Sequence, residues 1–286
     1  MKKTWLQDFM VLIKFRLNLL ALLTTWAGFY LASPFPLDGG LLFFTLAGAT
    51  VLAAGSGALN QWLEVEQDRQ MHRTKKRPLP SGRMGMPLAL GVGLFLSALG
   101  EFLLFWRVND LTAFLGLAAL VSYVIIYTPL KKVTSLCTLV GAVPGAIPPL
   151  MGWTAVRGQI GLEGLVLFFI LFLWQMPHFL AIGWIYREDY ARAGFPMLSV
   201  VDPEGRTTGW MSVIYAAALL PVSLLPYSCK ISGLVYFWTA LVLSLIFLLF
   251  SWNLALRKTM AQARRLFLVS IVYLTLLFAV MMWDRV

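Results

Sequence analysis

Three oxygen-bearing side chains follow one another at intervals of four residues near the end of an apolar segment. They are Asn60, Glu64 and Asp68. On an α-helix each step of four residues turns by about 40°, so these three side chains share one face, while Glu66 points elsewhere. Carboxylate and amide oxygens suit Mg²⁺, which also takes water and substrate phosphate as ligands. The spacing therefore predicts a magnesium site built from Asn60, Glu64 and Asp68.

A basic loop follows these acidic residues directly. Arg73 and Arg77 can present guanidinium groups to phosphate oxygens, and Pro78 and Pro80 end any helix there. Taken alone, a charged helix end is usually a solvated cap, and a basic loop is usually a topology signal. Acidic ligands followed at once by arginines favour a site where a divalent metal and a polyanion bind together.

A second polar cluster interrupts another apolar segment. Gln175 and His178 lie among leucines and phenylalanines, where polar residues are costly and mark functional candidates. A lone histidine in such a segment is also often only a hydrogen-bond partner between helices, so both interpretations stay open. Glu188, Asp189 and Tyr190 follow shortly afterwards and bring further carboxylates to the same side.

Two lysines and a small-residue stretch separate these clusters. Lys131 and Lys132 either reach a diphosphate or anchor a helix end, and the pattern does not choose between these roles. Glycines and prolines crowd residues 141–149. Small residues allow helices to approach closely, and prolines kink or open a helix, so this stretch is expected to shape a cavity.

The elements that carry these residues must lie in a membrane. The chain is 59% hydrophobic and 13% charged, which excludes a soluble globular protein and a disordered one. Two cysteines and two histidines exclude a disulfide framework and a histidine-rich metal centre. Apolar segments long enough to cross a bilayer lie at 17–33, 41–61, 87–106, 110–129, 137–155, 162–185, 208–227, 232–252 and 266–283. We expect an all-α integral membrane protein, with residues 1–286 forming one domain.

The distribution of charge predicts the orientation. Most of the 23 lysines and arginines lie in the connections on one side, which the positive-inside rule places in the cytoplasm. The N-terminus is then cytoplasmic, the C-terminus lies outside, and both polar clusters face the cytoplasm. The net charge of +10 is therefore a topology signal, and we expect no nucleic-acid partner. The first residues are too short and too weakly Arg/Ser-rich for a transit peptide, which favours a bacterial inner membrane over a mitochondrial one.

Together these motifs resemble the UbiA superfamily of intramembrane prenyltransferases, most closely its haem-farnesylating members. The likeness covers nearly the whole chain. The matching residues are Asn60, Glu64, Asp68, Met71, Arg73, Thr74, Arg77, Pro78, Leu79, Tyr127, Thr128, Lys131, Gly141, Pro144, Gly145, Ala146, Pro148, Pro149, Gly152, Trp153, Trp174, Gln175, Pro177, His178, Phe179, Asp189, Tyr190, Gly194, Pro196, Met197, Leu266, Phe267, Ser270, Tyr273 and Leu274.

This sequence departs from the superfamily pattern in two places. Glu64 stands where many members have Asp, although a longer carboxylate can still bind Mg²⁺. The second Asp-rich motif of the quinone-type relatives is not intact, and His178 with Glu188 and Asp189 occupies that region. The second departure favours a haem acceptor and argues against a second magnesium site.

The resemblance implies a fold, an activity and partners. The fold is a bundle of nine transmembrane helices around a central cavity. The activity is transfer of the farnesyl group of farnesyl diphosphate to a vinyl group of haem b, with addition of water, giving haem O and diphosphate for haem-copper terminal oxidases. The cofactor is Mg²⁺. The partners are farnesyl diphosphate, haem b, membrane lipid, and haem A synthase or the assembly proteins of terminal oxidases.

It also implies a role for each candidate residue. The metal ligands are Asn60, Glu64 and Asp68, and the diphosphate-binding residues are Arg73, Arg77, Lys131 and Lys132. The acceptor-binding residues are Gln175, His178, Asp189 and Tyr190. The residues expected to be catalytic are Asn60, Glu64, Asp68, Arg73, Arg77 and His178.

Two rival functions can be weighed on the sequence. A prenyltransferase with a quinone-precursor or chlorophyll-type acceptor shares the first cluster but should carry the second Asp-rich motif. A transporter usually carries inverted repeats and charges near the midplane of the membrane. Here both clusters lie at one face, and Glu101, the carboxylate deep in an apolar segment, lies near the opposite side.

Overall fold

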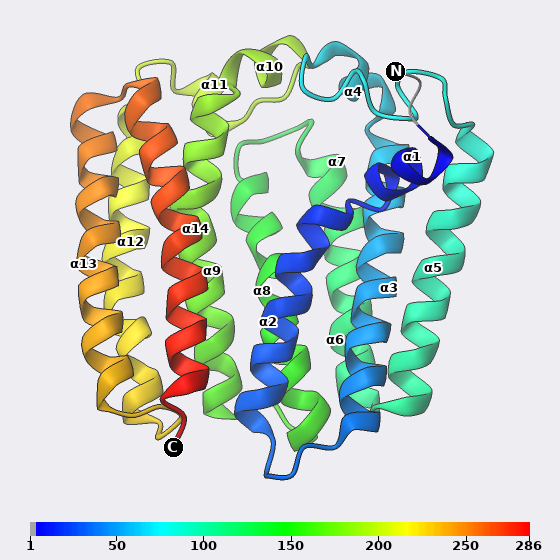
Figure 1. The fold of residues 1–286 in the computed structure, drawn as a ribbon. Coiled ribbons are helices and arrows are strands. Elements are labelled where there is room, and N and C mark those ends of the chain that lie inside the picture. Colours follow the sequence, from blue (N-terminus) through cyan, green and yellow to red (C-terminus); the bar gives the residue numbers. More distant parts are fainter. Residues whose placement is uncertain (1–3) are drawn as a thin grey trace.

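The computed structural model describes residues 4–286 as a bundle of helices (Figure 1). Within this part of the chain, nine helical stretches are long and apolar enough to cross a membrane, as predicted. They are α2 (Phe15–Ala32), α3 (Gly39–Leu63), α5 (Met86–Arg107), the continuous stretch of α6 (Asp110–Val121), η1 (Ser122–Tyr127) and α7 (Thr128–Leu130), α8 (Cys137–Arg157), α9 (Gly161–Ile185), α12 (Arg206–Ser228), α13 (Leu234–Arg257) and α14 (Met260–Trp283).

The last two helices differ most from the predicted boundaries. The apolar segments end at 252 and begin again at 266, whereas α13 runs to Arg257 and α14 begins at Met260. Lys258 stops α13 by adopting a left-handed backbone conformation with φ of 51°. Thr259 then caps α14 by accepting a hydrogen bond from the backbone N–H of Gln262. Hydropathy locates the apolar part of a helix, while the backbone continues until caps of this kind end it.

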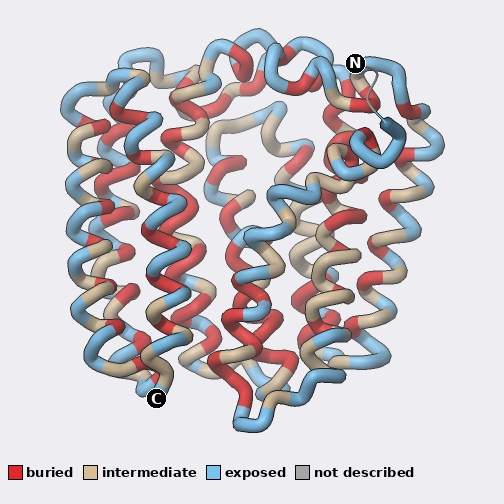
Figure 2. The backbone as a smooth tube through the Cα atoms, in the orientation of Figure 1, coloured by how far each residue is buried: buried red, intermediate tan, exposed pale blue. Residues whose placement is uncertain are grey.

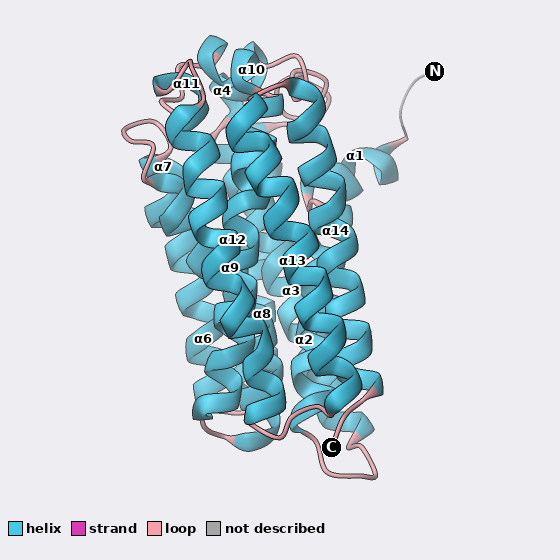
Figure 3. Cartoon of the chain, turned by 90° about the vertical axis from the view of Figure 1, so that its left-hand side faces the viewer, coloured by secondary structure: helices cyan, strands magenta, loops and turns pink. Residues whose placement is uncertain are grey.

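Short helices gather at one end of the bundle (Figures 1 and 3). They are α1 (Trp5–Leu12), α4 (Val65–Gln70), α10 (Arg187–Arg192) and α11 (Leu198–Val201). The N-terminal end of the described chain lies on this side, and the C-terminus lies at the opposite end. The loops that carry both predicted polar clusters are therefore brought to a single end of the molecule.

The helices α8 and α9 form the interior of the bundle. In the apolar stretches of α8 and α9, 67% and 56% of the residues are buried, which is more than in the other candidate spans. Figure 2 shows the buried residues concentrated on the inward faces of the helices. Close packing of α2 on α8 depends on glycine. A Cβ atom on Gly152 would lie 2.0 Å from the backbone oxygen of Thr25, and one on Gly28 would lie 2.0 Å from that of Pro149. The expected close helix approach in this region is confirmed.

Polar side chains between the helices bond to one another, as a lipid surrounding requires. The Tyr273 hydroxyl lies 2.7 Å from the Ser223 hydroxyl, and the Tyr236 hydroxyl donates to the Ser223 carbonyl at 2.7 Å. The outward faces instead expose large apolar residues such as Phe95 and Trp238. Apolar outward faces and hydrogen-bonded polar side chains between the helices fit a bundle that faces hydrocarbon. A polar functional site is therefore expected in the interior of the bundle.

Candidate active site

The helix that carries the three predicted metal ligands is interrupted at the second of them. Helix α3 ends at Leu63, Glu64 has φ of −103° and ψ of 9°, and α4 then begins at Val65. The turns continue on both sides, because the Glu64 N–H bonds to the Asn60 carbonyl and the Asp68 N–H bonds to the Glu64 carbonyl. The shared face of the three side chains is predicted for a regular helix, and the structure interrupts that helix at Glu64. Glu66 is exposed and pairs with Arg69 at 2.8 Å, so it does point elsewhere.

All three predicted ligands are buried, and each one contacts a different cation. The exposed fractions are 1% for Asn60, 3% for Glu64 and 0% for Asp68. The pairs are the Asn60 Oδ1 with the Lys14 Nζ, the Glu64 Oε1 with the Lys131 Nζ at 2.7 Å, and the Asp68 Oδ2 with the Arg77 Nη1 at 2.7 Å. The three cations come from the start of α2, the segment after α7 and the loop after α4, so three separate segments converge on this site.

The charge of Glu64 is stabilised by these neighbours. Burial alone raises the pKa of Glu64, but the positive charges of Lys131 and then Lys14 outweigh it, so the pKa lies below its ordinary value. Burial likewise lowers the pKa of Lys131, but the charge of Glu64, the neighbouring Tyr127 and Tyr190 and the hydrogen bond to Glu64 together outweigh it, so the pKa of this ammonium is raised. Both groups therefore stay ionised at neutral pH.

The oxygen atoms of this site fit a divalent metal. The Asp68 Oδ1 is buried and has no hydrogen-bond partner among the described residues, which leaves its lone pairs available. Within residues 4–286 no group of three or more His, Cys, Asp or Glu side chains forms a closed metal cage. Two carboxylates and one amide are an incomplete set of hard oxygen donors. Mg²⁺ commonly completes such a set with water and substrate phosphate.

A π-helical turn aligns the middle of the chain with this cluster. Directly after η1, the Thr128 Oγ1 donates to the Tyr123 carbonyl at 2.8 Å, five residues earlier, and accepts from the Asn60 Nδ2 at 2.9 Å. The Tyr123 hydroxyl accepts from the Lys14 Nζ at 3.0 Å. Turns of this kind are often found at functional sites. Here the π-helical turn joins α2, α3 and η1 around Asn60.

The two loops at this end of the bundle are held together by Asp189. Its carboxylate accepts from the backbone N–H groups of His72 and Arg73 at 3.0 and 3.1 Å, and from the Arg192 guanidinium at 3.0 Å. Burial raises the pKa of Asp189, but these two amide bonds and Arg192 lower it more, so its net pKa lies below the ordinary value. The Arg73 guanidinium lies 5.0 Å from the centre of the Tyr186 ring.

The remaining predicted residues lie in different parts of the molecule. Lys132 is exposed, and Tyr190 is buried in an apolar cluster with Met71 and Phe195. Gln175 and His178 instead line a cavity in the interior of the bundle. The structure thus brings Arg77 and Lys131 onto the acidic cluster and places Gln175 and His178 deeper. Arg73 lies in the loop after α4, and Asp189 lies in α10.

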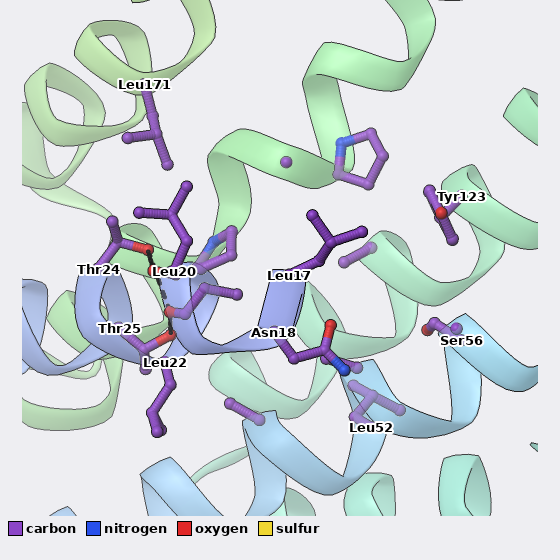
Figure 4. Close-up of a pocket in the computed structure, with 18 of the residues that line it drawn as sticks. Leu17, Asn18, Leu20, Leu22, Thr24, Thr25, Leu52, Ser56, Tyr123 and Leu171 are labelled. Atoms are coloured by element: carbon purple, nitrogen blue, oxygen red, sulfur yellow. Dashed lines mark hydrogen bonds between the residues drawn. The ribbon is translucent and has the colours of Figure 1, made fainter. Parts of the chain in front are cut away.

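The cavity has a volume of about 380 Å³ and is mostly apolar (Figure 4). Helices α2, α3, α6, α8 and α9 and the π-helical turn line it. Lys14, which bonds to Asn60, lines the cavity together with Leu52, Met151 and Leu171. Leu17 and Leu20 also line the cavity although they are 69% and 41% exposed, so it opens toward lipid beside α2.

Sequence reasoning missed several contacts of this site. Lys14 belongs to the excess of cations that predicts the orientation, and nothing in its type or neighbours separates it from Arg16. Tyr123 carried no motif. Ser270 matched the resemblance near the end of the chain, but its partner His178 lies 92 residues earlier, and only the fold brings them together.

A buried acid–cation cluster that is joined through Lys14 to an apolar cavity, inside a bundle of apolar helices, is an arrangement suited to an amphiphilic anion. The model of the UbiA prenyltransferase family matches residues 21–279. The chain belongs to the UbiA prenyltransferase family, and the resemblance drawn from its motifs is confirmed.

Relatives and solved structures agree with this assignment. The chain is 44% identical to the protoheme IX farnesyltransferase of Solibacter usitatus, over 98% of this chain and 99% of the relative. It is 45% identical to that of Koribacter versatilis, over 98% and 94%. A digeranylgeranylglyceryl phosphate synthase structure matches with a TM-score of 0.82 at 18% identity, covering 98% of both chains. A UbiA homolog from Archaeoglobus fulgidus bound to DMAPP and Mg²⁺ matches with a TM-score of 0.71 at 15% identity, covering 96% and 99%. These structures confirm the predicted UbiA-type bundle.

Proposed function

We propose that this chain transfers the farnesyl group of farnesyl diphosphate to a vinyl group of haem b, with addition of water, to give haem O and diphosphate. The relatives named above support this reaction. The observation that carries it is the set of buried contacts that Asn60, Glu64 and Asp68 make with Lys14, Lys131 and Arg77, of which Lys14 also lines the apolar cavity.

The acidic cluster holds the metal in this proposal. Asn60, Glu64 and Asp68 are its ligands, and Mg²⁺ when bound there would neutralise charge on the diphosphate. The free Oδ1 of Asp68 and the donor types support this assignment. The UbiA homolog structure bound to Mg²⁺ supports it at the level of the fold.

The cations around the cluster bind the diphosphate. Arg77 and Lys131 already meet the acidic cluster, Arg73 stands on the neighbouring loop, and Lys132 lies at the exposed rim. Negative charge grows on the diphosphate as its bond to the first farnesyl carbon breaks. Preorganised cations stabilise that charge, which lowers the barrier.

The cavity wall protects the reactive intermediate. Breaking the carbon–oxygen bond leaves an allylic cation that water would quench. Leu52, Met151 and Leu171 provide an apolar wall for the farnesyl chain. The terminal vinyl carbon of the acceptor then bonds to the first farnesyl carbon, and water adds to the other vinyl carbon with release of one proton.

Four residues are assigned to the acceptor. Gln175 and His178 line the same cavity as Lys14, so an acceptor beside them can reach the farnesyl carbon. Asp189 acts through the loop that it holds, and Tyr190 packs beneath that loop. A quinone-type acceptor is the second candidate, but a histidine stands in the region where such relatives carry an Asp-rich motif.

The proposal also covers placement in the cell. We place the site at the cytoplasmic face of a bacterial inner membrane, with the N-terminus inside and the C-terminus outside. The excess of lysine and arginine in the loops at the site's end of the bundle supports this orientation. Residues 1–286 act as one UbiA-type domain, with haem A synthase or oxidase assembly proteins as downstream partners.

Incubation with labelled substrate tests the reaction. Membranes containing the protein are supplied with haem b, labelled farnesyl diphosphate and Mg²⁺, and haem is extracted. The expected result is label in haem O, lost in Asp68→Ala and kept in Lys75→Ala, which changes an exposed lysine outside the site. Label in an aromatic quinone precursor and not in haem would contradict the proposal.

A further inference from the structure

The imidazole of His178 is packed against two stacked aromatic rings. The Trp174 indole stacks on it with centroids 4.8 Å apart and an interplanar angle of 23°. The Phe267 ring stacks on it at 5.1 Å and 29°. The Trp174 Nε1 in turn donates to the Ser270 carbonyl at 2.7 Å, which ties the two helices α9 and α14 together beside the histidine.

The hydrogen bonds at one edge of this ring assign its tautomer. The His178 Nδ1 lies 2.7 Å from the Ser270 Oγ. That hydroxyl donates its single proton to the Phe267 carbonyl at 2.6 Å. It must therefore accept from His178, so the proton of the neutral imidazole lies on Nδ1. The Nε2 atom is left with a lone pair.

The lone pair of Nε2 is available to a ligand. No described residue forms a hydrogen bond with Nε2, and His178 lines the cavity that runs from Lys14. With two rings stacked against the imidazole and Nδ1 bonded, Nε2 is the ring nitrogen that remains for a ligand. A rigid, neutral imidazole with its other nitrogen held by a protein oxygen is the arrangement typical of metal-binding histidines.

We propose that Nε2 of His178 coordinates the iron of the haem acceptor, and that Ser270 is the positioning residue that keeps Nε2 unprotonated. This inference rests on the proposed function, because it takes haem as the substrate. Imidazole nitrogen is a common axial ligand of haem iron. Coordination fixes the acceptor by its centre, so that a vinyl group on its rim can reach the farnesyl carbon in the same cavity.

A role as general base is less consistent with these contacts. A base must pass on the proton that it takes, and no described Asp or Glu side chain hydrogen-bonds to His178. The hydrogen-bond chain from Nδ1 runs through Ser270 and ends at the Phe267 backbone carbonyl, which cannot accept a proton permanently. Coordination needs no such relay.

Haem-binding spectra of the full-length protein in detergent test the inference. Ferric haem b is titrated into wild type, His178→Ala, Ser270→Ala and Ser270→Thr, and the absorption and spin-state spectra are recorded. His178→Ala should lose the histidine-ligated spectrum, and added imidazole should restore it. Ser270→Ala should weaken haem binding by about 10-fold to 100-fold, as loss of an outer hydrogen bond to a metal ligand does. Ser270→Thr keeps the hydroxyl and should bind like wild type.

The controls separate this inference from the proposed reaction. The sequence holds two histidines, so His72→Ala is the matched control and should leave the spectrum unchanged. Arg77→Ala should abolish farnesyl transfer and keep the ligated spectrum. If wild type makes haem O but His178→Ala keeps the wild-type haem spectrum, or imidazole fails to restore a lost one, the coordination is wrong and the reaction stands. If wild type neither binds haem nor makes haem O, the proposed function itself fails.

Discussion

Removing the ammonium of Lys131 should destabilise the protein through the carboxylate that it leaves behind. The Lys131 and Glu64 side chains are 11% and 4% exposed and lie 2.7 Å apart. Breaking a buried ion pair by deleting one partner costs about 3–5 kcal/mol, because the other charge stays buried and unpaired. Lys14 and Arg77 also act on Glu64 and soften this loss, so we expect the lower end, about 3 kcal/mol, for Lys131→Ala.

The effect should depend on pH in a defined direction. In wild type the lowered pKa of Glu64 means that its ionised form contributes stability at neutral pH, and this contribution is lost as the pH falls through the folded-state pKa. In Lys131→Ala the remaining cations Lys14 and Arg77 offset less of the effect of burial, so the pKa of Glu64 should lie higher than in wild type. The variant is then most destabilised at neutral pH, and its difference from wild type shrinks in acid.

Unfolding in detergent, followed by circular dichroism between acidic and neutral pH, measures this difference. The matched control is Lys75→Ala, an exposed lysine on the same end of the bundle, which should lie within about 0.5 kcal/mol of wild type. Equal unfolding free energies for the two variants at pH 7 would refute the reasoning. So would a difference that grows in acid.

Three further predictions concern packing, loop position and diphosphate binding. Gly152→Ala should lower the free energy of unfolding by about 1–3 kcal/mol or more, because its Cβ would meet backbone. Gly91→Ala, with open space around the Cβ, should stabilise by about 0.5–1 kcal/mol, and thermal unfolding compares the two. Asp189→Asn leaves one side-chain oxygen for the two backbone amides that the carboxylate now binds. Steady-state kinetics should therefore show a KM for farnesyl diphosphate raised by about 10-fold. An unchanged KM would count against the role of Asp189 in holding the loop. Arg73→Ala and Arg77→Ala should each lower haem O formation by about 100-fold or more while the protein stays in the membrane, and near-normal product from both would contradict the diphosphate assignment.

The spans could be predicted from the sequence because each needs a long run of apolar residues. The acidic motif could also be located, since its spacing is local to one segment. The interruption at Glu64 could not be predicted, because a one-residue change of backbone angle leaves no mark on the pattern of residue types. The π-helical turn before Thr128 was missed for the same reason.

Contacts between distant segments account for most of the rest. Lys14 meets Asn60 across 46 residues, and Ser270 meets His178 across 92, so no local pattern signals either pair. The resemblance implies an acceptor role for Asp189, and the structure adds that its carboxylate accepts from two backbone amides of another loop and from Arg192. A backbone donor is invisible in a sequence, because every residue except proline has one.

A structure with a non-reactive farnesyl diphosphate analogue and Mn²⁺ tests the central claim most directly. Anomalous scattering locates the metal independently of the protein. We predict a metal peak bound by oxygens of Asn60, Glu64 and Asp68, with the diphosphate against Arg77 and Lys131 and the farnesyl chain in the cavity beside Leu52. A metal peak away from Asp68, or an analogue bound outside this cavity, would contradict the account.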